Sequence, residues 1–258
     1  MHLAAPHLLT NLLAPLLSYG HHLASLKRAN GVVLDKPGKS SYDYPTSMRI
    51  IILLQTVSKV LERIAASRLA LQAMKLNLLH RNQCGSLPSL SSFDACLSLV
   101  DTVRTLERPG LKFSTRFLDI KRGFDYVSSP TRCTSLRKAG VPHYLVIWVQ
   151  LFLSQCSCQL LFQGSPRTFS PVPVGTPQGS PISPHLFVIY VSSLHIDLPK
   201  GVTLSYVDDF SLMAASLSYR TNIRILQKAF GAIRAKAHAR SVDFDVPKTK
   251  LIHRRTPK

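Results

Sequence analysis

The stretch SYVDDFS, residues 205–211, places two adjacent aspartates inside an apolar, strand-like run. The flanking segments 202–207 and 210–215 both have the pattern of strands, which predicts that Asp208 and Asp209 lie at the tip of a β-hairpin. Neighbouring carboxylates raise each other's pKa, and burying them in the ionised form costs free energy. The pattern therefore indicates that an opposite charge compensates this pair.

A third aspartate ends another predicted strand. Residues 112–120 are strand-like, contain Asp119 near their end, and lead into the turn KRGFD. If this strand pairs with the hairpin, Asp119 and Asp208 meet at one edge of the sheet and can bind Mg²⁺. Two such ions about 4 Å apart stabilise the attacking and leaving oxygens of a phosphoryl transfer. The simpler alternative is a solvated turn, because aspartate is a common turn residue.

The composition favours a polyanionic partner. The chain has 258 residues, of which 45% are hydrophobic, and 32 Lys and Arg stand against 13 Asp and Glu, a net charge of +19. Nucleic acid is the first candidate for the partner, and an anionic membrane surface is the second. The five cysteines form no C-x-x-C pair, so a reducing, intracellular location, nuclear or cytoplasmic, is expected rather than secretion.

Three uncharged stretches are long enough to be considered as membrane segments. Residues 1–26 carry no Asp, Glu, Lys or Arg, but they lack a positive leading region and are interpreted as a buried helix rather than a signal peptide. The stretches 139–166 and 168–196 are interrupted by Pro, Gly, Gln and Ser. Neither supplies about 20 consecutive apolar residues, so no membrane span is predicted.

Apolar spacing predicts the helices. The patterns favour helices at 57–76, 94–107 and 223–237, and the apolar run 143–155 predicts a buried helix. The run 187–194 fits a helix or a strand. The residues expected on inner faces are Val60, Leu61, Ile64, Leu97, Val100, Val103, Leu106, Ile223, Leu226, Phe230, Ile233 and Ala237.

The charged residues of the first of these helices, Lys59, Glu62 and Arg63, are expected on its outer face. Residues 31–45 are expected to form a short strand followed by an exposed basic loop that contains Pro and Gly. The order of helices and strands predicts an α+β domain in which helices back an antiparallel sheet.

Three motifs in register carry a family resemblance. FLDIKRGFD (117–125), GTPQGSPISPHLF (175–187) and SYVDDFSLM (205–213) resemble the palm motifs of reverse transcriptases from non-LTR (LINE-type) retrotransposons. LKRANGVVLDKPGK (26–39) and LLQTVSKVLERI (53–64) are most similar to fungal elements of the Tad type. The resemblance runs from about residue 21 to residue 257.

The resemblance implies an RNA-directed DNA polymerase that copies an RNA template by two-metal phosphoryl transfer. Its implied partners are the RNA template, a DNA primer or target, and dNTPs that react with the primer 3′-OH. The implied cofactor is a pair of Mg²⁺ ions, with Mn²⁺ as an alternative. The sequence indicates no oligomeric state.

The implied fold is the right-hand polymerase arrangement of fingers and palm. Residues 1–30 are expected to form a helical extension, 31–111 mostly fingers, and 112–258 mostly palm, with part of the fingers within 130–175. The chain stops ten residues after Lys248, so a thumb is expected to be absent.

The resemblance assigns the reacting centre. Asp119 and Asp208 are implied as the main metal-binding carboxylates, with the backbone carbonyl of Ile120 assisting and Asp209 as the second acid of the doublet. Tyr206 is implied near the primer end.

The resemblance also assigns a leaving-group acid. Lys248 matches a lysine near the end of the palm for which protonation of the departing pyrophosphate is a plausible role. Lys250 is a nearby competitor, and the sequence does not separate the two.

Two residues that follow the first motif aspartate have open assignments. Phe124 matches a steric gate against the ribose 2′-OH, although a core phenylalanine is the simpler reading of an aromatic after a strand. Asp125 matches a second motif acid, and a helix-capping role is equally consistent with it.

The nucleotide-binding residues follow from the other motifs. Gln178 and Gly179 belong to a loop that the family places under the incoming nucleotide. Lys36 and Arg49 match positions that bind the triphosphate, where charge-assisted hydrogen bonds are strong, and Lys39 is a further candidate.

Two departures from the family pattern bear on these assignments. Ile50 stands where a proline is common, which affects the expected geometry of the basic loop. Gly123 stands where alanine is frequent.

The sequence leaves two alternative functions open. One is a truncated, inactive remnant that retains only nucleic-acid binding. The other is an RNA-templated RNA polymerase, which Phe124 disfavours because ribonucleotides need room for their 2′-OH.

Overall fold

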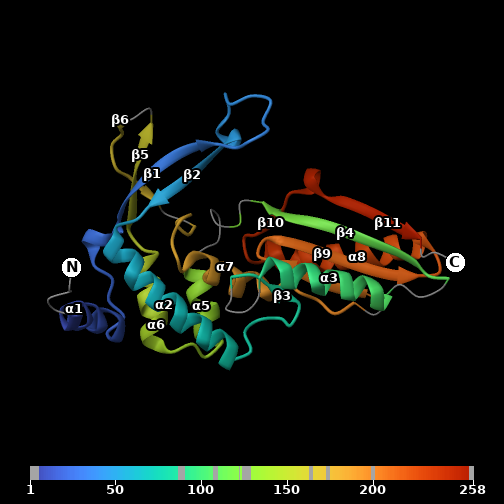
Figure 1. The fold of residues 1–258 in the computed structure, drawn as a ribbon, viewed down its shortest axis with the longest axis horizontal. Coiled ribbons are helices and arrows are strands. Elements are labelled where there is room, and N and C mark those ends of the chain that lie inside the picture. Colours follow the sequence, from blue (N-terminus) through green and yellow to red (C-terminus); the bar gives the residue numbers. More distant parts are fainter. Residues whose placement is uncertain are drawn as a thin grey trace. The chain divides into compact units, whose positions relative to one another are not determined.

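The computed structural model describes residues 6–86, 91–106, 110–121, 123, 129–162, 165–172, 175–198 and 201–255. The chain forms two compact units, each built from two separate segments of sequence (Figure 1). Unit 1 comprises Met1–Gln72 and Val127–Ser183, and unit 2 comprises Ala73–Tyr126 and Pro184–Lys258.

Unit 1 combines four helices with a five-stranded sheet in the residues that the structure describes. The helices are α1 (Pro6–Ser18), α2 (Thr56–Lys75), α5 (Ser129–Lys138) and α6 (His143–Phe152). The strands are β1 (Arg28–Asp35), β2 (Met48–Leu53), β5 (Cys156–Phe162), β6 (Ser165–Pro166) and β7 (Ser170–Val172). Strand β1 is antiparallel to β2 and parallel to β5. Short 3-10 turns occupy Ala24–Lys27 and Pro45–Ser47.

The core of unit 1 follows from helical spacing. Leu61, Ala65 and Leu69 recur every four residues along α2 and are completely buried, as expected for one face of a helix. The structure corrects the expected faces of α2 at two positions. Val60 is 44% exposed although it was expected inside. Glu62 is completely buried although it was expected outside.

Unit 2 is a six-stranded sheet with helices on both faces. The helices are α3 (Ser92–Leu106), α7 (Ser183–Ser192) and α8 (Tyr219–His238). The strands are β3 (Gln83–Cys84), β4 (Lys112–Lys121), β8 (Gly201–Tyr206), β9 (Asp209–Ser216), β10 (Asp243–Phe244) and β11 (Lys250–Arg255). The sheet order is β10-β4-β9-β8-β3, and β11 also pairs with β4. The 3-10 turn Val246–Lys248 links β10 to β11.

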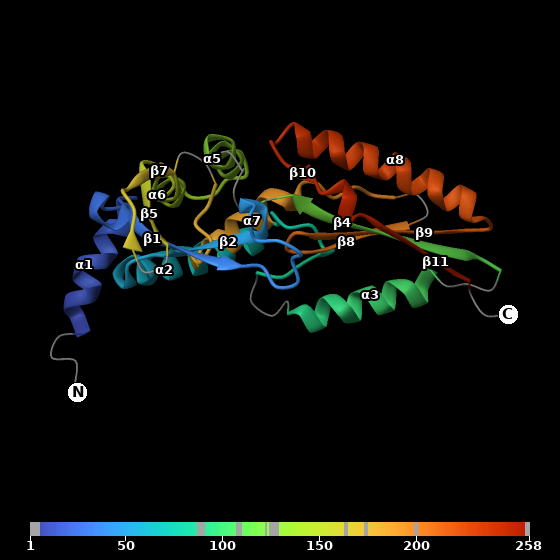
Figure 2. The same cartoon turned by 90° about the horizontal axis from the view of Figure 1, so that it is seen from above.

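The two faces of this sheet are covered differently (Figure 2). Helix α8 packs its buried residues Leu226 and Ile233 toward β4 and β9. Helix α3 lies on the opposite side, where its residues pack on a cluster that contains Phe113 and Met213. Because alternate residues of a strand point to opposite faces, α3 covers the same face that carries Asp119, but at the other end of β4.

The structure confirms the α+β class and most of the expected elements. The expected hairpin is formed by β8 and β9, and the ambiguous run 187–194 belongs to helix α7. Strands β5, β6 and β7 had no counterpart in the sequence interpretation. The expected inner face of α3 is partly wrong, because Leu97 and Val100 are 51% and 45% exposed.

Among the described residues, none of the helices combines the length and the apolar character that crossing a membrane requires.

Candidate active site

Strand pairing in unit 2 brings the predicted acids together. Asp119 of β4 lies directly opposite Asp209 of β9, and Asp209 in turn lies opposite Tyr206 of β8. Asp208 occupies the turn between the hairpin strands, and its backbone carbonyl accepts a hydrogen bond from the Ile120 amide at 3.3 Å. Directly opposite residues of antiparallel strands have Cβ atoms about 4.5–5.5 Å apart. The carboxylates of Asp119 and Asp209 therefore project from the same face of the sheet.

The electrostatics of this cluster match the repulsion expected from the sequence. Partial dehydration raises the pKa of Asp209, the charges of Asp208 and Asp119 raise it further, and Lys248 lowers it. The side chain of Asp119 is 25% exposed. The cluster is thus accessible from outside and carries excess negative charge, which favours binding of a cation.

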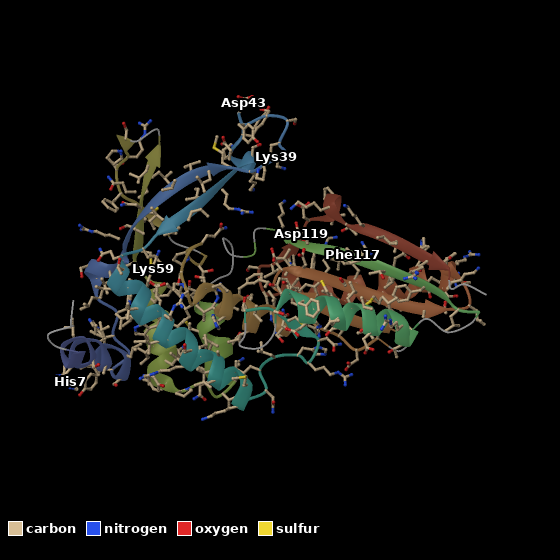
Figure 3. The ribbon with its side chains drawn as sticks, viewed as in Figure 1. His7, Lys39, Asp43, Lys59, Phe117 and Asp119 are labelled. Carbon is tan, nitrogen blue, oxygen red and sulfur yellow. The ribbon has the colours of Figure 1, made fainter. Side chains whose placement is uncertain are left out.

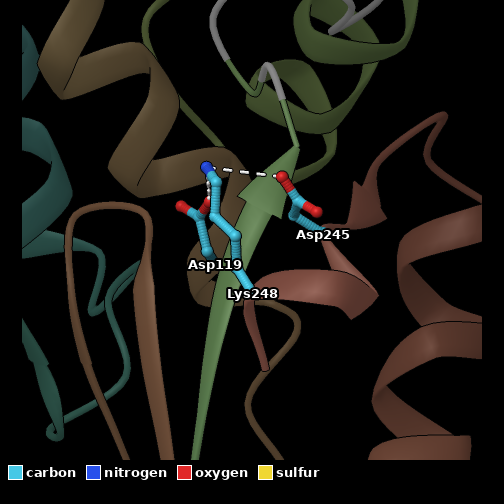
Figure 4. A network of polar contacts seen from close by, with 3 residues as sticks. All are labelled: Asp119, Asp245 and Lys248. Carbon is cyan, nitrogen blue, oxygen red and sulfur yellow. Dashed lines mark hydrogen bonds and ion pairs between the residues drawn. The ribbon is translucent and has the colours of Figure 1, made fainter. Parts of the chain in front are cut away.

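Lys248 supplies one positive charge to the cluster (Figure 4). Its Nζ lies 2.5 Å from Asp119 Oδ2 and 3.3 Å from Asp245 Oδ2. The Asp245 amide donates to the Asp119 carbonyl at 2.8 Å, which ties the turn to β4. The hydrogen bond with Asp119 is the main cause of the raised pKa of Lys248. Lys250, by contrast, lies in β11 opposite Phe117.

The donor chemistry of the cluster fits a hard divalent cation. Across the described ranges, no group of three or more His, Cys, Asp or Glu side chains forms a metal-binding cluster. Mg²⁺ however commonly takes only one or two protein carboxylates, with water and substrate phosphate completing its shell. The facing carboxylates of Asp119 and Asp209 supply that number. The Lys248 ammonium at Asp119 shows that this carboxylate already interacts with a cation.

A glycine that the sequence interpretation missed supports the hairpin tip. Gly85 follows β3 with φ +86°, and a Cβ there would lie 2.7 Å from Val207 Cγ2 and 3.0 Å from the Tyr206 ring. Gln83 of β3 accepts a hydrogen bond from the Ser205 hydroxyl at 2.6 Å. The segment 83–85 therefore packs closely under the strand that carries Tyr206. The signal that could have found it is the glycine in the segment NQCGS, residues 82–86.

A buried histidine, His195, supports the face of β8 opposite to the one that carries Tyr206. His195 is 6% exposed, and its two ring nitrogens lie 3.0 Å from Thr203 Oγ1 and 2.7 Å from Ser205 Oγ. Its ring stacks on that of His80 at 4.3 Å. Burial is the main cause that lowers the pKa of His195 to about 3, so this residue is a neutral structural support.

The residues after Asp119 are only partly described. Phe124 and Asp125 lie outside the described residues, and their expected roles stay predictions. At Gly123, a Cβ would lie 2.5 Å from the buried ring of Phe187. Glycine therefore fits at this position, where alanine is frequent in the family, because the ring of Phe187 occupies the space that a Cβ would need.

In unit 1, the predicted triphosphate-binding residues lie on the antiparallel pair β1 and β2 and on the loop between them, which carries Lys39 (Figure 3). Arg49 of β2 lies opposite Leu34 of β1. The Lys36 amide donates to Ser47 O at 2.9 Å, and the Tyr42 hydroxyl donates to Lys36 O at 2.9 Å. These bonds fix the backbone at both ends of the basic loop.

The remaining basic-loop positions are on the outside. Lys39 is exposed. Ile50, which replaces the common proline, is a residue of β2 opposite Val33 and is 42% exposed. The strand therefore continues through this position.

The loop with Gln178 and Gly179 packs closely against β2. The Ile52 amide donates to Gln178 O at 2.7 Å, and a Cβ on Gly179 would lie 2.7 Å from Ile52 O. Gly179 has φ +115°, which favours glycine. The loop needs glycine here for both its conformation and its contact with the strand.

A buried carboxylate that the sequence interpretation missed anchors this loop. Glu62 of α2 accepts hydrogen bonds from Ser58 Oγ at 2.6 Å and from Ser180 Oγ, one on each oxygen. Ser180 Oγ also accepts from the Ile182 amide at 3.3 Å. Burial raises the pKa of Glu62, while the two serine hydrogen bonds lower it.

The predicted site residues thus form two groups, one within each unit. Asp119, Tyr206, Asp208, Asp209 and Lys248 belong to unit 2, and their mutual contacts are described above. The other group, in unit 1, consists of Lys36, Arg49, Gln178 and Gly179.

The α+β fold, with Asp119 and Asp209 facing each other across β4 and the hairpin of β8 and β9, fits the class of polymerase palm domains. Residues 34–257 match the family described as Reverse transcriptase (RNA-dependent DNA polymerase). The chain belongs to this family.

Relatives by sequence come from mobile elements of Drosophila melanogaster. The RNA-directed DNA polymerase from mobile element jockey is 24% identical over 85% of this chain and 23% of its own length. The probable RNA-directed DNA polymerase from transposon BS is 25% identical over 81% of this chain and 24% of its own length. The chain spans about a quarter of the length of these relatives. The matches confirm the resemblance to a LINE-type reverse transcriptase domain, whereas the likeness to fungal Tad elements stays a prediction.

The solved structures with the same fold include telomerases. The structure of telomerase from Candida tropicalis in complex with a fragment of telomeric RNA has a TM-score of 0.63 at 13% identity and covers 96% of this chain and 44% of its own. The corresponding structure from Candida albicans has a TM-score of 0.60 at 16% identity and covers 98% of this chain and 47% of its own. These likenesses confirm the fold.

Proposed function

We propose that the chain is the domain of an RNA-directed DNA polymerase that joins dNTPs to a primer 3′-OH on an RNA template. The observation that carries this proposal is the pairing of Asp119 with Asp209 beside Asp208 and Lys248. Membership of the reverse transcriptase family supports it. We assign the palm to unit 2, most of the fingers to unit 1, and an extension to α1.

Reverse transcriptases generally use divalent metal ions, and two Mg²⁺ ions, or Mn²⁺, would stabilise charge on the attacking and leaving oxygens. Asp119, Asp208 and Asp209 are the proposed carboxylate ligands, with the Ile120 carbonyl as a further oxygen donor. Tyr206, on the same face of the hairpin as Asp209, would contact the primer end.

Lys248 is the proposed proton donor to the departing pyrophosphate. It is preferred to Lys250 because its Nζ contacts Asp119 directly. The same charge would also hold Asp119 in place before substrate binds.

The incoming dNTP is assigned to the four predicted site residues of unit 1 and to Phe124. Lys36 and Arg49 would bind the triphosphate through charge-assisted hydrogen bonds. Gln178 and Gly179 would contact the base pair that forms, and Phe124 would exclude a ribose 2′-OH.

The template is proposed to be RNA held mainly through its phosphates. The net charge of +19 favours a polyanion, and a solved structure with this fold is a telomerase in complex with telomeric RNA. Such binding should weaken steeply with salt.

Primer extension tests the proposal. A labelled DNA primer on an RNA template should be extended with dNTPs and Mg²⁺, and EDTA should stop the reaction. Preference for dNTPs over rNTPs would exclude the alternative of an RNA polymerase. Template binding without any extension would favour the alternative of an inactive, nucleic-acid-binding remnant.

A further inference from the structure

The outer face of α8 carries a row of positive charge. Residues 219–238 contain no Asp or Glu. Arg220, Arg224 and Lys228 are all exposed and follow one another at intervals of four residues, so they lie on the same face of the helix. They span about 12 Å along the helix axis at 1.5 Å per residue. We call these three residues the α8 basic row.

Neighbouring side chains do not neutralise this row. In the part of the chain that the structure describes, the ion pairs involve other cations, and the one on α8 joins Arg234 to Asp243 at 3.7 Å. Gly231 continues the face on which the row lies, and a Cβ there would have no atom within 4 Å. The surface is therefore open beside the row.

The row is unfavourable for the helix itself. Like charges four residues apart on a helix repel each other and slightly destabilise it. Arg220 also stands in the first turn, which contains no acidic residue and where the helix dipole disfavours a cation. The folded chain alone gains nothing from this arrangement, whereas a bound polyanion would.

The aromatic side chains of α8 are engaged within the protein. Arg116 lies over the ring of Phe230 at 3.9 Å, and Lys112 lies over the ring of Tyr219 at 5.0 Å. Neither ring is available as a platform for stacking of bases. A ligand on this face would therefore be held through its charge and not through its bases.

The α8 basic row is separate from the carboxylate cluster. The Asn222 amide of α8 donates to Ser114 Oγ at 3.1 Å. Ser114 and Asp119 are an odd number of residues apart on β4, so their side chains point to opposite faces of the sheet. The row lies beyond α8 on the face of the sheet opposite to the one that carries Asp119.

We propose that the α8 basic row is a second RNA-binding surface, which holds backbone phosphates of template RNA outside the reacting centre. Charge complementarity identifies the occupant as a polyanion, and the choice of RNA rests on the proposed function. Binding through phosphates makes the contact independent of sequence. Each phosphate contact on a single strand contributes about 0.7 to the slope of log K against log salt.

The test is RNA binding by the full chain without nucleotides or divalent metal, so it does not depend on polymerase activity. The triple variant Arg220→Gln, Arg224→Gln, Lys228→Gln is titrated against a fluorescent 30-nucleotide RNA by anisotropy. Its Kd should rise on the order of ten-fold, and its salt slope should fall by about 2, as expected for three lost phosphate contacts.

A matched control removes the same charge elsewhere. The variant Arg63→Gln, Lys75→Gln, Lys138→Gln neutralises three cations at exposed helical positions that do not form a row. It should keep a Kd within about two-fold of the wild type. An equal loss in the control would show that only net charge matters, and this result would overturn the proposal.

Two further measurements separate RNA binding by the row from unfolding of the variant and from binding to a membrane. Because the substitutions relieve like-charge repulsion, the urea midpoint of the α8 variant should equal or exceed that of the wild type, so a loss of binding cannot be ascribed to unfolding. Unchanged RNA affinity would overturn the proposal. If the α8 variant instead loses binding to anionic lipid vesicles while its RNA affinity is unchanged, the row would be assigned to a membrane surface.

Discussion

Glu62 in unit 1 and the pair Asp119 and Asp209 in unit 2 are acidic residues that the protein holds in opposite ways. Glu62 is completely buried, and a serine hydroxyl donates to each of its oxygens. Asp119 is a quarter exposed, faces another carboxylate, and contacts the ammonium group of an exposed lysine. The first arrangement gives both carboxylate oxygens hydrogen-bond donors within the protein, whereas the second leaves carboxylates available to a cation from solution. Only the second suits chemistry on a bound substrate.

The largest expected effect is on catalysis at the exposed pair. Asp119→Asn should reduce primer extension by on the order of 10³-fold, because a group that stabilises transition-state charge is lost. RNA affinity and the urea midpoint should remain near wild type, because binding depends on distributed Lys and Arg. Single-nucleotide extension rates check this prediction, and an extension rate within a few-fold of wild type would contradict it.

The buried carboxylate should show the reverse pattern. Glu62→Ala should lower the free energy of unfolding by about 3 kcal/mol, because the hydroxyls of Ser58 and Ser180 lose their acceptor in the interior. Urea unfolding measures the effect. The double variant Ser58→Ala, Ser180→Ala provides the control, since adding Glu62→Ala to it should cost much less than in the wild-type background.

Lys248 should matter for the reaction and Lys250 should not. Lys248→Met should reduce single-turnover extension about 10²-fold through loss of general acid catalysis. Lys250→Met, which changes a residue paired with Phe117, should stay within about three-fold of wild type. Equal losses in both variants would contradict the assignment of the proton donor to Lys248, which rests on its 2.5 Å contact with Asp119.

Buried titratable groups should also set the acid sensitivity of the fold. The pKa of His195 is lowered to about 3 in the folded chain, against about 6.5 when unfolded. Below pH 6.5 the unfolded chain takes up a proton that the folded chain refuses, so stability falls as pH falls. From pH 7 to pH 5 this residue should cost about 2 kcal/mol.

Urea unfolding at both pH values, in wild type and in His195→Gln, tests this effect. The variant should lose about 2 kcal/mol less than the wild type between the two pH values. His22, whose pKa is lowered to about 4 mainly by burial, contributes with the same sign in both proteins. Identical pH dependence in wild type and variant would assign the effect to other groups.

The sequence predicted the exposed site better than the buried one, for a physical reason. The strands around Asp119, Asp208 and Asp209 have strong local patterns, and their expected limits differ from the observed ones by a residue or two at most. Glu62 was placed on the wrong face of its helix, because its partner Ser180 is 118 residues away. Local periodicity carries no information about such a partner.

Two further elements show the same limit. Helix α7 has Pro184 in its first turn, a position that proline favours, and this signal could have decided between helix and strand. The short strands β6 and β7 exist only because they pair with β5. Their own sequences, of two and three residues, carry no usable period.

Binding of Mn²⁺ tests the central claim most directly, namely that the exposed carboxylates of unit 2 bind the metal. The free Mn²⁺ signal in electron paramagnetic resonance is titrated with wild type, with the double variant Asp119→Asn, Asp208→Asn, and with Glu62→Gln. Wild type and Glu62→Gln should bind Mn²⁺ with similar affinity, and the double variant should bind at least ten times more weakly. Equal Mn²⁺ binding by wild type and the double variant would contradict the account.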